Sequence, residues 1–545
     1  MFLTGEAGAN FLRPSSHASG AEHIEMKGNL PRALFWVAIV ALLLPLVLVN
    51  YFPSCDGPAH VLNASLLDRM LLQGDVQLRY WFTLNPVVVP NWSGHLILIA
   101  LLRFLPGPVA ERVLIAIYVI AFLPAFRYML RGLTRDTQGL EFLALPLVYN
   151  MHLYWGFYNF CIALVVYLLL LGLFLRSDGA WSSVRMSAFA GLAMLLYLSH
   201  GLMFLFGVLT VAILAFVRRR ATFYDALRAL RIPALLFLPC LLLFLDYTLF
   251  RVNRAQSILE WPAMRYSASQ LFILAPLAPF RGQERYFAAA YAAFLYGLVG
   301  LRLWQLRRKW PAPELLCLAL IGTLSVFVLP VAASGATMIT ARLVYLPVFA
   351  LIGWLAASPV PIPWAWARAG VVLSIAIAFG LQFIRIPLYR AYNRDLIQIV
   401  AALAPLVHLN GVYAEDTGAS VGPLTNAGTV SMPDVSPNAM GFLGVSNRAM
   451  ILSNYEAHED HFPLLFRAER DPYNHVFRYL TGPIAPPKGS LGQVDGFLFW
   501  CNSRAQGMCS TDRLGDLFQV QRLAEGPQAA SWWVRTSTLS TREQH

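Results

Sequence analysis

Long apolar stretches alternate with short polar ones over about the first 385 residues. Runs of this length match the roughly 20 residues that a helix needs to cross a hydrocarbon layer of about 30 Å. A shorter, interrupted run at 92–105 is better explained as a helix lying at the membrane surface. We therefore expect eleven transmembrane helices, at 34–49, 109–128, 138–152, 157–175, 186–199, 201–217, 232–249, 287–304, 314–331, 343–357 and 364–385.

Arginine placement predicts the direction of each crossing. If the N-terminus is cytoplasmic, the groups at 127–135, 176–185, 218–231 and 302–309 all face the cytoplasm, as positively charged loops prefer. Counting 92–105 as a crossing would place the Arg218 group outside, which favours the interfacial helix. We expect a cytoplasmic segment at 1–31 and a membrane domain at 32–385. The membrane domain should have two external loops, at 50–108 and 250–286, and an extracytoplasmic α/β domain should follow at 386–545.

The tail after residue 385 has shorter apolar stretches and more polar residues than the preceding part. An amphipathic helix is expected at 388–403, followed by short apolar strands. Cys501 and Cys509 could bridge in an oxidising compartment. The strands are expected at 411–415, 449–452, 496–500 and 517–520, and 516–522 should form a β-hairpin with 530–536.

Composition supports a membrane protein. Hydrophobic residues make up 58% of the 545 and charged residues only 13%, about half the charged share of a soluble globular chain. The net charge of +12 does not indicate nucleic acid, because the arginines lie at the ends of apolar runs. An arginine-rich, lysine-poor chain is compatible with a GC-rich bacterium, and hence with an inner membrane and a periplasmic tail.

Polar residues that are unusual near a membrane gather on the predicted external side. Ionisable groups at membrane depth are costly and usually face a cavity, a partner or a substrate. Each alone is more typical of a helix cap or a packing residue, but their shared side suggests one pocket. They are Asp56, His60, Asn91, His95, His152, Tyr158, Asn159, His200, Asp246 and Arg342.

Asp56 is the strongest single candidate. Gly57 and Pro58 turn the chain after the first span, and the stretch up to Leu72 is predicted to be helical. A carboxylate at the start of that helix could cap it, or could act as a base or a ligand. The sequence leaves these roles open.

The external loop 250–286 is unusually rich in arginine. It is either a solvated, partly amphipathic loop or a binding region for an anionic headgroup or phosphate. Its arginines are Arg251, Arg254, Arg265, Arg281 and Arg285.

Other familiar chemistry is absent from the sequence. It contains no Walker or Rossmann glycine loop and no serine elbow of a hydrolase. The segment from His458 to His461 has metal-ligand composition, but its spacing is more typical of a solvated loop. No cofactor is indicated, and a divalent metal ion is left open.

Several short motifs resemble the GT-C superfamily of glycosyltransferases, which includes protein O-mannosyltransferases and lipid A aminoarabinose transferases. The first span ends in an acidic residue, many spans follow, and the tail domain is external. The motifs are Asp56-Gly-Pro-Ala-His60, Pro86, Pro90-Asn91, Ala110-Glu111-Arg112, Tyr154-Trp-Gly-Phe-Tyr-Asn-Phe160 and Asn454-Tyr-Glu-Ala457.

The resemblance implies inverting transfer of a hexose or pentose from a polyprenyl-phosphate donor to a glycan, lipid or protein acceptor. In that family the carboxylate after the first span activates the acceptor hydroxyl, a role that falls to Asp56 with His60 beside it. Relatives often carry a second acidic residue, for which Asp246 or Glu260 would have to substitute. Arg342 is the candidate for the lipid phosphate. The remaining substrate-binding candidates are Tyr345, His152, Tyr158, Asn159, His200, Arg251 and Arg254.

Two other classes stay open. A transporter would concentrate polar residues near the midplane rather than at one rim. A non-catalytic relative would bind a lipid-linked glycan or serve as a scaffold in the cell envelope.

Overall fold

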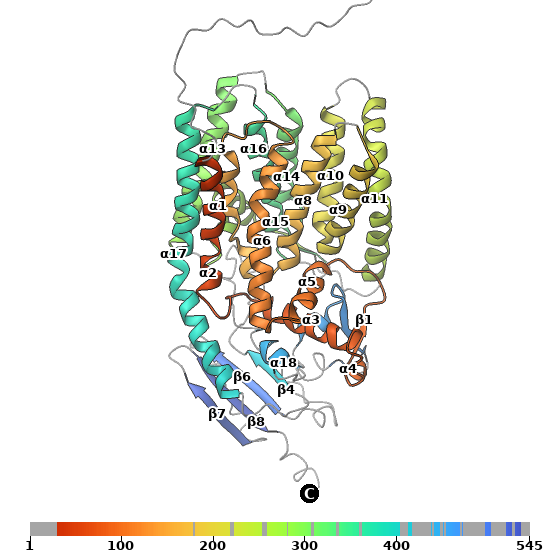
Figure 1. Cartoon of the computed structure of the whole chain (residues 1–545), viewed down its shortest axis with the longest axis vertical. Coiled ribbons are helices and arrows are strands. Elements are labelled where there is room, and N and C mark those ends of the chain that lie inside the picture. Colours follow the sequence, from red (N-terminus) through yellow and green to blue (C-terminus); the bar gives the residue numbers. More distant parts are fainter. Residues whose placement is uncertain are drawn as a thin grey trace, which may run out of the picture.

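The computed structural model is mainly helical (Figure 1). It describes residues 30–177, 180–218, 223–252, 259–280, 282–306, 310–333, 337–358, 362–403, 412–416, 438, 441–446, 451, 454–468, 471, 496–502, 519–525 and 529–535. Most of the predicted cytoplasmic segment 1–31 and residue Cys509 therefore lie outside the described residues.

A bundle of roughly parallel helices forms the larger part of the molecule (Figure 1). Apolar residues face both the bundle interior and its outer surface, as expected for helices in a bilayer. The helices are α1 (Leu30–Leu42), α2 (Leu44–Val47), α6 (Gly107–Leu130), α8 (Tyr158–Ser177), α9 (Ser183–Ser199), α10 (Gly201–Arg218), α11 (Phe223–Val252), α13 (Glu284–Leu306), α14 (Pro313–Val328), α15 (Ile339–Leu343), α16 (Tyr345–Ala356) and α17 (Trp364–Leu403).

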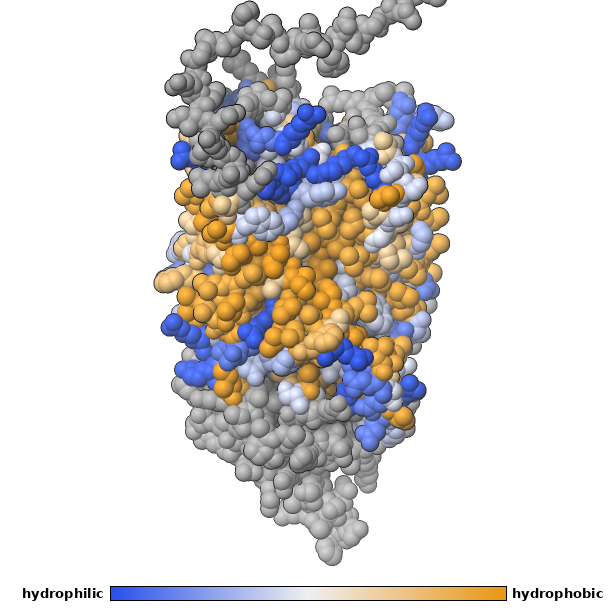
Figure 2. All heavy atoms as spheres, in the orientation of Figure 1, coloured by the Kyte–Doolittle hydropathy of each residue, from blue (hydrophilic) through white to orange (hydrophobic). Residues whose placement is uncertain are grey.

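In the part of the chain that the structure describes, six helical stretches are long and apolar enough to cross a membrane. Four more predicted spans are shorter apolar helices, at Ala33–Val47, Ser183–Ser199, Gly201–Val217 and Pro313–Val328. On the face shown in Figure 2, a hydrophobic band crosses the middle of the molecule, with hydrophilic residues above and below it. The chain is a multi-pass membrane protein.

The predicted span 138–152 is not a continuous α-helix. It forms the 3₁₀ helix η1 (Leu140–Leu147), which contains Pro146, and the short helix α7 (Met151–Tyr154). Proline has no backbone N–H and disfavours an uninterrupted α-helix. Asn150 begins α7, because its side chain accepts hydrogen bonds from the N–H groups of His152 and Leu153. All eight residues of η1 are buried, so this segment is part of the protein core.

The chain between α2 and α6 forms short elements at one end of the bundle. They are α3 (Gly57–Leu71), α4 (Leu78–Trp81), β1 (Phe82–Leu84) and α5 (Ser93–Leu102). The predicted interfacial helix at 92–105 is thus present as α5, and the helix predicted after Asp56 is α3. Strand β1 pairs antiparallel with β5 (Leu464–Phe466), with Phe82 opposite Phe466. The tail and the loop predicted at 50–108 therefore fold together.

The tail also contributes a four-stranded sheet in the order β4-β6-β8-β7. Strands β4 and β6 run parallel, while β8 is antiparallel to both β6 and β7. This confirms the predicted hairpin, although only Ile451 of the strand predicted at 449–452 is described, as an isolated bridge. The strands are β4 (Val412–Asp416), β6 (Gly496–Asn502), β7 (Gln519–Glu525) and β8 (Ala529–Arg535).

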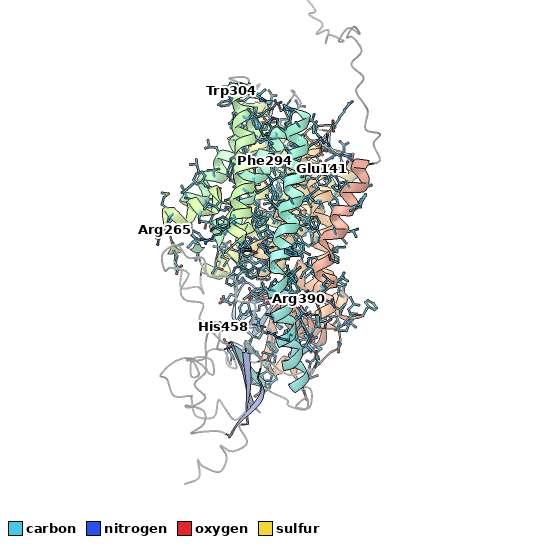
Figure 3. All side chains as sticks on the ribbon, turned by 90° about the vertical axis from the view of Figure 1, so that its left-hand side faces the viewer. Glu141, Arg265, Phe294, Trp304, Arg390 and His458 are labelled. Carbon is cyan, nitrogen blue, oxygen red and sulfur yellow. The ribbon has the colours of Figure 1, made fainter. Side chains whose placement is uncertain are left out.

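Helix α17 links the bundle to this sheet. Its 40 residues pass through position 385, where the hydropathy pattern predicts a boundary, without a break in the helix. The predicted last span and the predicted amphipathic helix are therefore one element. Figure 3 labels Trp304 near one end of the molecule, and Arg390 and His458 toward the other, where the short elements lie.

The loop predicted at 250–286 contains a short strand and two short helices. Strand β2 (Leu259–Glu260) pairs with β3 (Ala332–Ala333), and α12 (Met264–Phe272) and η2 (Ala275–Leu277) precede α13. Two short helices in the tail, α18 (Gly441–Ser446) and α19 (Tyr455–His458), pack against α3.

Candidate active site

The backbone around Asp56 is fixed by the connection between α7 and α8. The N–H groups of Cys55 and Asp56 donate to the carbonyls of Tyr154 and Trp155, at 2.9 and 3.1 Å. Gly156 has φ +78°, and a Cβ there would lie 2.7 Å from the Asp56 nitrogen. Only glycine fits this close approach without displacing the Asp56 loop.

A buried carboxylate, Glu111, also holds the Asp56 loop in place. Glu111 of α6 accepts hydrogen bonds from the Ser54 and Tyr158 hydroxyls, at 2.8 and 2.5 Å. A Cβ at Gly57 would collide with all three of these groups. Tyr158 is therefore part of the support of the Asp56 loop and is not among the residues that line the cavity described next.

The Asp56 side chain does not cap α3, although Asp56 occupies the N-cap position. Its Oδ1 instead accepts a hydrogen bond from Asn438 Nδ2 at 3.0 Å. Burial raises the pKa of Asp56 to about 6, with Glu456 adding to the effect and His60 and hydrogen bonds from Tyr455 and Cys55 opposing it. A half-buried carboxylate with this pKa is available for proton transfer near neutral pH.

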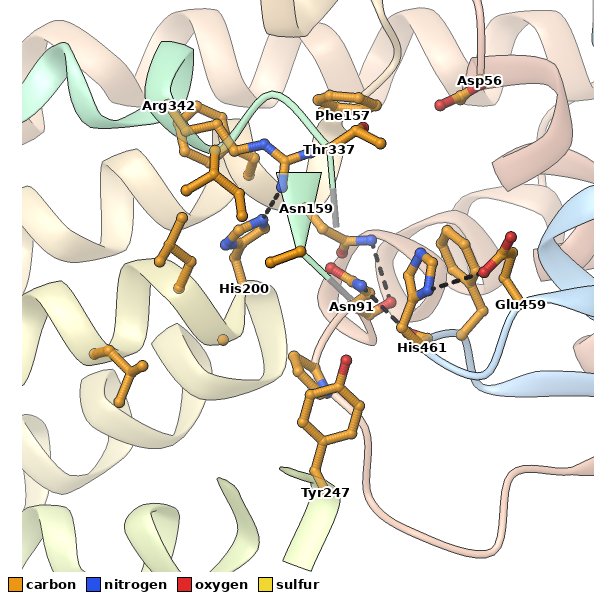
Figure 4. A pocket seen from close by; sticks show the side chains of 18 of the residues that line it. Asp56, Asn91, Phe157, Asn159, His200, Tyr247, Thr337, Arg342, Glu459 and His461 are labelled. Carbon is orange, nitrogen blue, oxygen red and sulfur yellow. Dashed lines mark hydrogen bonds and ion pairs between the residues drawn. The ribbon is translucent and has the colours of Figure 1, made fainter. Parts of the chain in front are cut away.

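Asp56 opens into a cavity of about 460 Å³ (Figure 4). Its wall combines polar groups from the short elements with apolar side chains from α10 and α11. The lining residues are Asp56, His60, Pro90, Asn91, Phe157, Asn159, Phe160, His200, Gly201, Leu202, Leu205, Phe244, Tyr247, Thr248, Ala333, Thr337, Ile339, Arg342, Tyr455, Glu459, His461 and Phe462.

Arg342 brings a positive charge to this cavity. Its Nη1 lies 3.0 Å from His200 Nε2, and its guanidinium lies over the ring of Phe157, 4.5 Å from the centroid. Arginine can only donate, so His200 accepts through a lone pair and its ring is neutral. In the described part of the chain Arg342 Nε has no hydrogen-bond partner and no carboxylate forms an ion pair with Arg342. No ion pair therefore compensates the Arg342 charge within the described chain.

Asn159 holds the start of α5 against the cavity. Its Oδ1 accepts from the Gly94 N–H at 2.7 Å and from the Ser93 hydroxyl at 3.2 Å, while its Nδ2 donates to the Asn91 carbonyl. Asn91 in turn donates to the His461 carbonyl at 3.2 Å. These bonds join α8, α5 and the tail into one wall.

His152 and Tyr345 lie behind the wall. His152 Nδ1 is 3.1 Å from the Tyr345 hydroxyl, and its ring packs against Phe160. Both side chains are fully buried and neither lines the cavity. Their contacts support Phe160 rather than reach a substrate.

Two predicted candidates in the described chain, Asp246 and Glu260, do not line the cavity. Asp246 is exposed, because the cavity face of α11 carries Phe244, Tyr247 and Thr248 instead. The Arg251 side chain and all of Arg254 lie outside the described residues. Glu260, the other suggested second carboxylate, is in β2 and does not line the cavity.

Sequence reasoning missed the contribution of the tail. Tyr455, Glu459, His461 and Phe462 all line the cavity, and Glu459 adds a carboxylate to Asp56 among the described lining residues. The sequence pattern favours a solvated loop from His458 to His461, but His461 lies in the wall and His458 pairs with Asp471 at 2.6 Å. The tail reaches the cavity through contacts with residues almost 400 positions earlier in the chain. Such contacts leave no local sequence pattern from which the position of the tail could have been predicted.

The tail is held against α3 and α5 by buried polar pairs. The side-chain amides of Asn63 and Asn454 exchange two hydrogen bonds of 2.9 Å. His60 and His95 both face the carboxylate of Glu456, at 2.8 and 3.1 Å. Burial alone would raise the pKa of Glu456, but the two histidines outweigh it and lower the pKa to about 2. These three residues are the group that could hold a metal ion in the described part of the chain.

Comparisons with known proteins bear on the fold. No protein family and no curated protein matches the sequence. Among solved structures, ArnT from Cupriavidus metallidurans bound to undecaprenyl phosphate is similar, with a TM-score of 0.51 and 13% identity. The match covers 93% of this chain and 98% of ArnT. The GT-C-like fold that the sequence motifs suggested is thereby confirmed for this chain.

Proposed function

We propose that this protein is a membrane glycosyltransferase that moves a sugar from a polyprenyl-phosphate donor to an acceptor at the outer face of the membrane. The observation that carries the proposal is one cavity that contains both a carboxylate, Asp56, and an arginine without a carboxylate partner in the described chain, Arg342. The similarity to a structure that binds undecaprenyl phosphate supports the same substrate class.

In the proposed reaction an acceptor hydroxyl attacks the anomeric carbon of the donor. The new glycosidic C–O bond forms as the bond between that carbon and the phosphate oxygen breaks. Asp56 takes the hydroxyl proton, and polyprenyl phosphate leaves with the bonding electron pair. Attack opposite the leaving group inverts the anomeric configuration.

Arg342 would bind the phosphate, whose negative charge grows as the bond breaks. Arginine donates in a planar fork that matches phosphate oxygens, and a water-poor pocket strengthens the interaction. The neutral ring of His200 orients the guanidinium without cancelling its charge.

The apolar wall is suited to the lipid part of the donor. Leu202, Leu205 and Phe244 line the cavity on α10 and α11. Leu205 is also 37% exposed, which is compatible with access for an isoprenoid chain at this side of the cavity.

Transfer by an Asp56→Asn variant tests the proposal. The full-length protein in membranes would receive undecaprenyl-phosphate donors carrying radiolabelled hexose or pentose. We expect transfer to fall about 100- to 10,000-fold, the range for loss of a general base, while donor binding persists. Asp246→Asn is the matched control, because Asp246 is exposed and outside the cavity. Unchanged transfer by D56N would instead favour a non-catalytic glycan binder.

A further inference from the structure

Three residues from distant parts of the chain converge beside the cavity. His60 of α3, His95 of α5 and Glu456 of α19 present side-chain atoms that all lie within 4.8 Å of one another. They are 5%, 0% and 0% exposed. We call them the buried triad.

The second nitrogen of each imidazole has a backbone partner. His95 Nδ1 lies 2.9 Å from the Asn91 carbonyl, which can only accept, so the ring proton is on Nδ1. The backbone of Gly156 is likewise a hydrogen-bond partner of the His60 ring. Imidazoles that bind metals are commonly held in this way, with the far N–H donating to a carbonyl.

The nitrogens that remain point at one carboxylate. His95 Nε2 is 3.1 Å from Glu456 Oε2, and His60 Nδ1 is 2.8 Å from Glu456 Oε1. Within the described chain His60 Nδ1 and Glu456 Oε1 are in ion-pair range of each other, and neither atom has another hydrogen-bond partner. A buried imidazole nitrogen and a carboxylate oxygen this close need a proton or a metal ion between them.

We propose that the buried triad binds a divalent transition metal, with zinc the best match. Two imidazoles and one carboxylate are a common zinc ligand set, whereas magnesium and calcium prefer oxygen ligands. Zinc takes four ligands, and His60 also lines the cavity, so a water or a substrate oxygen can fill the fourth position. Binding of one metal ion by all three side chains would join α3, α5 and α19. The site does not depend on the proposed glycosyl transfer.

Metal content of the purified full-length protein tests the proposal. After growth with zinc and purification in detergent without chelator, elemental analysis should give about one zinc per chain. His95→Gln and Glu456→Gln should lower zinc affinity roughly 100-fold or more, because even outer partners of a ligand contribute 10- to 100-fold. His458→Gln is the matched control, since this histidine lies two residues from Glu456 and outside the cavity lining. It should keep its zinc.

A metal titration of the wild-type protein tests the proposal even if the variants fail to fold. The wild-type protein is stripped with a chelator and titrated with Zn²⁺, Co²⁺ or Mg²⁺ while thermal unfolding is followed. Zinc and cobalt should raise the unfolding temperature, magnesium should not, and bound cobalt should show the intense visible absorption of a four-coordinate site. A wild-type chain that purifies without zinc and gains neither stability nor absorption would overturn the proposal. Equal zinc content in wild type and H95Q would overturn it as well.

Discussion

Two buried arginines, Arg385 and Arg342, differ in how far their charge is compensated by neighbouring groups. Arg385 of α17 lies 2.5 Å from the Glu284 carboxylate and donates to Tyr149 and Leu277 carbonyls and to the Tyr154 hydroxyl. In the described chain the side chain of Arg342, in α15, makes one hydrogen bond, to His200, and lies over two phenylalanine rings, while its Nε is unpaired. The first arginine is fully neutralised, and the second is not.

The difference has a physical meaning. Desolvating a guanidinium is costly unless an anion and several acceptors replace water. Arg385 meets that condition inside the protein, so its role is to join α17, α13 and the connection before α7. Arg342 has the Asp56 carboxylate in the same cavity but no ion pair within the described chain. We therefore expect an anionic substrate to be the partner of the Arg342 guanidinium.

Removing Arg385 is expected to have the largest effect. Arg385→Gln leaves Glu284 buried without its cation, which should lower the free energy of unfolding by about 3–5 kcal/mol. Thermal unfolding of the detergent-solubilised protein measures this loss. Replacing Glu284 by Gln in the same chain should recover part of it, since no uncompensated charge is then left. An R385Q protein as stable as wild type would contradict the structural role.

Removing Arg342 should affect binding rather than stability. Arg342→Gln is expected to weaken undecaprenyl phosphate binding about 10- to 100-fold, the equivalent of one strong charge-assisted interaction, with little change in unfolding temperature. Native mass spectrometry with added lipid measures the affinity. Lysine at this position should restore only part of it, because it lacks the planar fork.

Arg265→Gln is the matched control for Arg342, because Arg265 is exposed and absent from the cavity lining. If both variants lost the lipid equally, the arginine-rich loop rather than the cavity would bind the phosphate.

The pH dependence of transfer should be a smaller effect that reports on Asp56. The groups facing this carboxylate are His60, Glu456, Tyr455 and Arg342. Its pKa of about 6 lies above the ordinary value, so the base is ionised above pH 6 and lost as pH falls through 6. We expect kcat/KM to drop about tenfold per pH unit below that point. An acid limb centred near the ordinary aspartate pKa of about 4 would argue against the raised pKa, provided that unfolding is monitored over the same range.

Sequence patterns predicted the parts of the molecule that depend on local hydrophobicity. The bundle, the helix after Asp56, the short helix α5 and the tail hairpin all follow from apolar runs and turn residues. The exception is 138–152, where apolar composition suggested an α-helix and Pro146 lies in a 3₁₀ segment. Length and hydropathy do not distinguish a lipid-crossing helix from a buried segment of the core.

The candidate site was only partly predictable. Asp56, His60, Asn159, His200 and Arg342 line the cavity, as their shared side of the membrane suggested. Asp246 does not, because a difference of one or two residues turns a side chain from one helix face to another. Residues of the tail, such as Glu456 and Glu459, reach the site only through tertiary pairing with α3 and α5, which no local pattern encodes.

A cryo-electron microscopy map of the Asp56→Asn variant with a bound polyprenyl-phosphate sugar would locate the substrate relative to both charged residues of the cavity. We expect phosphate density within hydrogen-bonding reach of the Arg342 guanidinium and the sugar between Phe157 and position 56. Phosphate density at the Arg265 loop, or a donor whose sugar points away from position 56, would refute the pairing of Asp56 and Arg342 in one transfer site.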